Sequence, residues 1–131
     1  MGLEEKRWAK TKREKEGPAF TAQIQAITGT KAAVDVDWDA FSENLEEVGY
    51  ISDDQYGLNN LLRALTSICA DDLGKDAIKD SLKKVVVKPA KSAEAKFAFE
   101  GGIISWSAYF GSKSEGYIYT DAMKKALESK L

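Results

Sequence analysis

Residues 95–110 read AKFAFEGGIISWSAYF, a pattern typical of a β-hairpin. Phe97 and Phe99 fall on one face of the first strand, because alternate side chains of a strand point to the same side. Gly101-Gly102 predicts a two-residue type I′ turn, which needs positive φ at both central positions. The return strand carries its own apolar face, formed by Ile104, Trp106, Ala108 and Phe110.

Upstream of this hairpin, two further segments have the composition of strands. Residues 84–88 (KVVVK) are rich in β-branched side chains, and Pro89 is expected to end the strand. Residues 19–38 alternate apolar and polar side chains on both sides of Gly29. This alternation predicts a second hairpin that turns at residues 28–31.

The remaining segments predict helices. The clearest periodic signal covers residues 55–71, where apolar side chains recur at spacings of three and four and continue to Leu73. A short helix is expected over 40–48, capped by Asp39 or Ser42. Residues 72–74 interrupt the pattern before a turn or two over 75–83, and a last helix, capped by Thr120, is expected from 121 to about 130.

Together these elements predict an α+β protein in the order α-ββ-α-α-βββ-α. We expect an antiparallel sheet of about five strands, built from two hairpin units, with helices packed on one face. Residues 1–16 are expected to form a charged helical arm, ended by Gly17-Pro18, beside a single α+β domain over 17–131.

The composition restricts the chemistry that the chain can perform. It contains no histidine and one cysteine, Cys69. Histidine-dependent triads and histidine-ligated zinc are therefore excluded, and no cofactor is predicted. The lone cysteine and the charged, non-apolar beginning of the chain lead us to expect a cytoplasmic location. No apolar run approaches the roughly 20 residues that cross a bilayer, so no membrane partner is expected.

Charge is distributed unevenly along the chain. Residues 35–80 carry twelve acidic and three basic side chains, a net of −9, whereas residues 81–131 carry nine lysines and five acids, a net of +4. Such segregation favours a non-enzymatic protein–protein interaction module, whose partner is another protein or a second copy of the chain. The candidate partner-binding residues on the arm are Trp8, Arg7 and Arg13.

An acidic segment, residues 35–46, supports calcium binding as an alternative function. Counted from Asp35, carboxylates fall at the positions of an EF-hand loop, and the candidate ligands are Asp35, Asp37, Asp39 and Glu46. Against this, Ala40 stands where the loop needs glycine, and alternate side chains of a strand lie about 7 Å apart. The competing interpretation is an acidic strand face that ends in a helix cap.

Three tyrosines near the Gly/Ser-rich loop 111–116 support the other alternative, a small-ligand binding protein or a histidine-free enzyme. Tyr109, Tyr117 and Tyr119 could line a ligand pocket beside that loop. Tyrosines are also common at sheet edges without any ligand.

Nucleic acid is not expected as a partner. The candidate basic residues are five lysines in or near the predicted strands (Lys83, Lys84, Lys88, Lys91 and Lys96), together with five residues of the arm (Lys6, Arg7, Lys10, Lys12 and Arg13). Against this, the sequence pI is about 5.3. A nucleic-acid surface would need these lysines together with aromatic rings that stack on bases.

Overall fold

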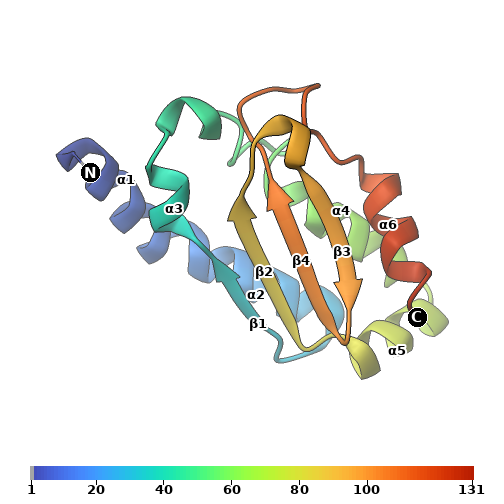
Figure 1. Cartoon of the computed structure of the whole chain (residues 1–131). Helices are drawn as coiled ribbons and strands as arrows, with labels where there is room; N and C mark the ends of the chain where they lie inside the picture. The colour runs from blue at the N-terminus through green and yellow to red at the C-terminus, as the bar shows by residue number, and fades with distance from the viewer. Residues whose placement is uncertain (1) are drawn as a thin grey trace.

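The computed structural model describes residues 2–131 as a sheet with helices packed against one side (Figure 1). Within these residues the sheet has four strands in the order β1-β2-β4-β3, namely β1 (Ala33–Val36), β2 (Lys84–Pro89), β3 (Lys96–Glu100) and β4 (Ile103–Ala108). β2 runs parallel to both β1 and β4, and only β3 and β4 are antiparallel. The α+β class is confirmed, but an antiparallel sheet of about five strands is wrong.

The hairpin at residues 95–110 is confirmed as β3 and β4. Gly101 and Gly102 have φ of 59° and 81°, the positive values that a type I′ turn requires. Phe97 lies opposite Trp106, and Phe99 lies opposite Ile104, so the apolar faces of both strands coincide.

The mixed sheet arises from the connection between β2 and β3. After Pro89 the chain passes through a short 3-10 helix, η2 (Ser92–Glu94), and crosses over to the outer edge of the sheet before β3 begins. The return strand β4 then fills the place next to β2 and runs in the same direction. Strand composition identifies these strands but carries no information about which neighbour each one selects.

The expected hairpin at residues 19–38 is the largest error, because most of this segment is helical. α1 (Leu3–Glu14) is followed by α2 (Glu16–Thr28), and only β1 remains as a strand. The buried side chains of α2 are Phe20, Ile24 and Thr28, spaced by four as on one helix face. Pro18 lies in the first turn, where a missing N–H breaks no helical hydrogen bond. Gly29, with φ of 68°, ends this helix rather than turning a hairpin.

The middle of the chain forms shorter helices than expected. α3 (Trp38–Ser42) and the 3-10 helix η1 (Leu45–Val48) replace the single helix over 40–48, and the cap of α3 is Asp37 rather than Asp39 or Ser42. α4 (Asn59–Ile68) is the expected core helix. α5 (Asp72–Ser81) already begins at the expected interruption, so Leu73 points outward and is 83% exposed.

The last helix, α6 (Thr120–Glu128), lacks the expected side-chain cap, because the hydroxyl of Thr120 donates to Asn60 in α4 instead. In the core, α2, α4 and α6 pack against the inner face of the sheet. The side chains at its centre are completely or almost completely buried (Ile24, Leu61, Leu65, Val85, Val87, Ile104 and Leu127). In the described part of the chain, no helix has both the length and the apolar content needed to span a bilayer.

Candidate functional site

One face of the sheet carries no helix, and we refer to it as the outer face (Figure 1). The register brings Asp35, Val86, Ser105 and Ala98 into one row across all four strands. Asp35 and Ser105 are exposed, and Val86 and Ala98 are half-buried. The complete outer face consists of Ala33, Asp35, Lys84, Val86, Lys88, Lys96, Ala98, Glu100, Ile103, Ser105 and Ser107.

An uncovered outer face is unusual for parallel strands. Parallel sheets are normally covered on both faces, whereas antiparallel sheets often leave one face in water. Here three of the four strands, β1, β2 and β4, are mutually parallel and still have one open side. The side chains at the centre of this face, Val86, Ala98 and Ser105, are short, and Ile103 near one end is 40% exposed. The surface therefore suits contact with another macromolecule.

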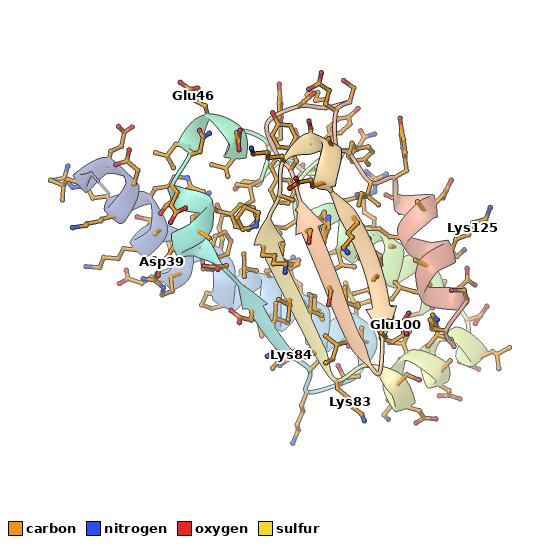
Figure 2. All side chains as sticks on the ribbon, in the orientation of Figure 1. Asp39, Glu46, Lys83, Lys84, Glu100 and Lys125 are labelled. Atoms are coloured by element: carbon orange, nitrogen blue, oxygen red, sulfur yellow. The ribbon has the colours of Figure 1, made fainter. Side chains whose placement is uncertain are left out.

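Charged side chains lie toward both ends of the outer face. At one end, Lys84 and Glu100 share a row with Ile103 (Figure 2), and Glu100 forms an exposed ion pair of 3.2 Å with Lys130. At the other end, Lys88 and Lys96 lie on either side of Ser107 in a single row.

The structure thus places three of the five lysines predicted as a group, Lys84, Lys88 and Lys96, on the outer face. The aromatic rings of the strands, Phe97, Phe99 and Trp106, lie on the opposite, inner face.

Of the candidates on α1, Trp8 and Arg13 are engaged within the chain. The ring of Trp8 contacts that of Trp38 in a T-shaped arrangement, with centroids 6.1 Å apart, and Arg13 forms an ion pair with Asp39. Ala9, the next residue to Trp8, is only 2% exposed. Arg7 is exposed.

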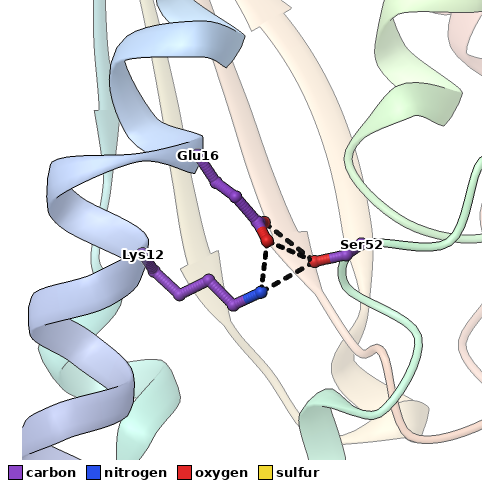
Figure 3. Close-up of polar contacts among 3 residues, drawn as sticks. All are labelled: Lys12, Glu16 and Ser52. Atoms are coloured by element: carbon purple, nitrogen blue, oxygen red, sulfur yellow. Dashed lines mark hydrogen bonds and ion pairs between the residues drawn. The ribbon is translucent and has the colours of Figure 1, made fainter.

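A cluster of three polar side chains connects the junction of α1 and α2 to the loop before α4 through hydrogen bonds and an ion pair (Figure 3). Lys12 forms an ion pair with Glu16 and donates to Ser52 Oγ at 2.9 Å. Ser52 Oγ in turn donates to Glu16 Oε2 at 2.8 Å. The contacts of Trp8, Lys12 and Arg13 together pack α1 against the rest of the chain.

The four acidic candidates at residues 35–46 do not converge. Asp35 lies on the outer face, Asp37 accepts a hydrogen bond from Ala40 N at 3.1 Å, and Asp39 pairs with Arg13. Glu46 belongs to η1, well away from Asp39 in Figure 2. Among residues 2–131, no three acidic, cysteine or histidine side chains gather as metal ligands would.

The tyrosine candidates separate into two places. The rings of Tyr117 and Tyr119 have centroids 4.8 Å apart, and Tyr117 also contacts Tyr56 at 5.0 Å. Tyr109 packs instead beside Gly111 and Gly116.

Two further tyrosines, Tyr50 and Tyr56, lie beside the Gly/Ser-rich loop and were not predicted from the sequence. The ammonium of Lys113 lies 5.5 Å from the ring centroid of Tyr50 and 5.4 Å from that of Tyr56. Both tyrosines come from a segment about 60 residues upstream of the loop. No local pattern could have connected them to it.

A hollow of about 270 Å³ lies elsewhere, at the carboxyl ends of β2 and β4. Its polar lining consists of three acidic side chains, from the end of α3, from η1 and from η2, and one lysine (Glu43, Glu47, Glu94 and Lys91). Its apolar lining includes Phe41, Val48 and Pro89. Tyr109, Tyr117 and Tyr119 do not line it.

Tyr117 should make stability depend on pH in the alkaline range. Partial burial raises the pKa of its phenol above the ordinary 10.0. The single proton of its hydroxyl is shared between two acceptors, Gln55 O at 3.3 Å and Asn60 Oδ1 at 3.4 Å, and the ionised form has no proton to donate. Because the folded chain holds this proton more tightly than the unfolded chain, its contribution to stability is complete below pH 10 and is lost as pH rises through the raised pKa. Urea unfolding of Tyr117→Phe between pH 8 and 11 should show a weaker alkaline loss than the native chain. Parallel curves would contradict this assignment.

Comparison with protein-family models, with curated proteins and with solved structures finds no match to this chain.

Proposed function

We propose that the chain is a non-enzymatic protein-interaction module that binds its partner through the outer face of the sheet. The observation that carries this proposal is the open face of three parallel strands, whose central side chains are small and partly apolar. Covering this face would give the parallel strands the second layer that such strands normally have. A partner with a flat apolar centre and acidic groups near Lys88 and Lys96 fits the surface best.

A protein partner fits the outer face better than a nucleic acid. Single-stranded nucleic acids bind open sheets mainly by stacking bases on aromatic side chains. The corresponding central positions of this outer face are Val86, Ser105 and Ala98, which offer no ring.

The state of the single thiol also favours binding over catalysis. Cys69 caps the end of α4, and burial raises the pKa of its thiol. A raised pKa leaves less thiolate at neutral pH, and the chain has no histidine that could act as its base.

Site-specific photo-crosslinking tests the proposal. With benzoylphenylalanine in place of Ser105 we expect a discrete adduct to another polypeptide in the source cells, because this position is exposed at the centre of the outer face. The matched control carries the same group at Lys125, which is exposed on α6 in the helical layer (Figure 2). Adding Ala98→Arg, on the neighbouring strand, should abolish the Ser105 adduct by steric and charge conflict. Adducts of equal yield at both positions, or none at Ser105, would refute binding through the outer face.

A further inference from the structure

The free edge of β1 offers backbone hydrogen-bonding groups to a further strand. β1 is the terminal strand of the sheet. The N–H groups of Ala33 and of Asp37, the residue that follows β1, donate to Lys83 O and Val87 O, at 3.3 and 2.9 Å. In a parallel ladder, alternate residues point their backbone groups to opposite sides. The N–H and C=O groups of Val34 and Val36 therefore point away from β2, and no backbone hydrogen bond from another described segment reaches them.

A groove follows this edge. Its volume is about 510 Å³, and it lies between β1 and one face of α2. The α2 side is built from mostly small side chains at helical spacing, and Pro18 and Ala22 among them are exposed (Gly17, Pro18, Thr21, Ala22 and Gln25). The helical layer thus continues beyond β1, where it could support the inward side chains of a fifth strand.

The negative charge of Asp35 at this edge determines which kind of strand can pair with β1. Asp35 is exposed on the outer face in the middle of β1, and among residues 2–131 its carboxylate forms no ion pair. Arg13, which also lines the groove, is already paired with Asp39. An incoming strand with Lys or Arg opposite Asp35 would form a favourable cross-strand pair, whereas an acidic residue there would be repelled.

A second copy of the chain fits this edge poorly. Antiparallel pairing of two β1 strands in the register that pairs Val34 of each copy with Val36 of the other, and so uses the free backbone groups of both valines, would place Asp35 directly opposite Asp35 of the second copy. Like charges in such a position destabilise the pairing.

From these features we infer that β1 binds an extended segment of a partner protein as a fifth strand. The segment alternates small apolar side chains, which enter the groove toward α2, with outward side chains that include Lys or Arg opposite Asp35. This inference rests on the proposed interaction function and specifies the chemistry of the partner.

Two synthetic peptides test the inference on the purified full chain. Both are blocked heptapeptides in which valine alternates with threonine, and the central outward residue is lysine in one and glutamate in the other. In a titration followed by amide NMR, the lysine peptide should shift the amides of Val34 and Val36 and slow their hydrogen exchange, because both become hydrogen-bonded. It should bind roughly 2- to 30-fold more tightly than the glutamate peptide, since a cross-strand charge pair contributes up to about 1 kcal/mol in either direction.

Two variants test whether the charge at position 35 causes the preference between the peptides. Asp35→Lys should reverse the preference between the peptides, and Asp35→Asn should remove it. Asp35 is exposed, so both variants should keep the fold, and circular dichroism checks this. Absence of any shift up to millimolar peptide, or a preference unchanged in Asp35→Lys, would overturn strand addition at β1. Shifts confined to Ser105 and Ala98 would overturn it as well, yet they would agree with binding through the outer face, so the two proposals can fail separately.

Discussion

Asn60→Ala is expected to lower the free energy of unfolding by about 3–5 kcal/mol. Asn60 is completely buried in α4. Its Nδ2 donates to Ile118 O at 2.5 Å, and its Oδ1 accepts from the hydroxyls of Thr120 and Tyr117. Removing the amide leaves these groups without their partner in a poorly hydrated place, and each buried unsatisfied group costs about 1–3 kcal/mol. Urea unfolding with an unchanged m-value measures the loss.

The neighbouring residue provides a matched control for this prediction. Asn59 is half-buried, and its amide donates to an exposed carboxylate, Asp54 Oδ1, at 3.3 Å. Asn59→Ala should therefore cost less than about 1 kcal/mol. Equal losses in the two variants would show that Asn60 does not hold the segment before α6 to α4. Because Tyr117 and Tyr119 belong to that segment, Asn60→Ala should also loosen the tyrosine group.

Gly74→Ala is expected to destabilise the protein by about 2–3 kcal/mol, opposite in sign to the usual effect within a helix. Alanine normally favours a helix over glycine by about 1 kcal/mol. At Gly74, however, a Cβ would lie 1.9 Å from the backbone oxygen of Ile68, the last residue of α4. A backbone atom cannot move aside as a flexible side chain can, so α5 would have to shift away from α4.

Gly49→Ala is the control for this second substitution. Gly49 has φ of −58°, and no atom outside its immediate neighbours lies within 4 Å of the added Cβ. We expect a change within about 1 kcal/mol, in the stabilising direction, because alanine restricts the unfolded chain. Thermal unfolding of both variants would measure the contrast. A Gly74→Ala variant as stable as the native chain would contradict the close approach of α5 to α4.

For the candidate site, sequence could supply residues but not their grouping. The alternation in residues 33–37 correctly suggests one acidic and one apolar side of a strand, and Asp35 does lie on an exposed face. The meeting of Asp35 with Val86, Ser105 and Ala98 depends on pairing between strands that are up to about 70 residues apart. Similarly, Tyr56 meets Tyr117 only because the loop before α4 packs against the segment before α6.

By itself the sequence determined the elements whose evidence is local. The hairpin at 95–110, the strand at 84–88 and the apolar face of α4 follow from alternation, from paired glycines and from helical spacing, all of which act between near neighbours. Only the tertiary structure decided the state of residues 16–28, where apolar side chains recur both at alternate positions, as in a strand, and at a spacing of four, as on a helix face. There, burial of Phe20, Ile24 and Thr28 against the core selected the helix. The tertiary structure also decided that β4 lies parallel to β2. Residues 90–95 carry the chain past the position next to β2 to the edge of the sheet, and β4 then occupies that position. The uncovered outer face and the free edge of β1 follow from this arrangement, since a sheet face or edge exists only after its strands have assembled.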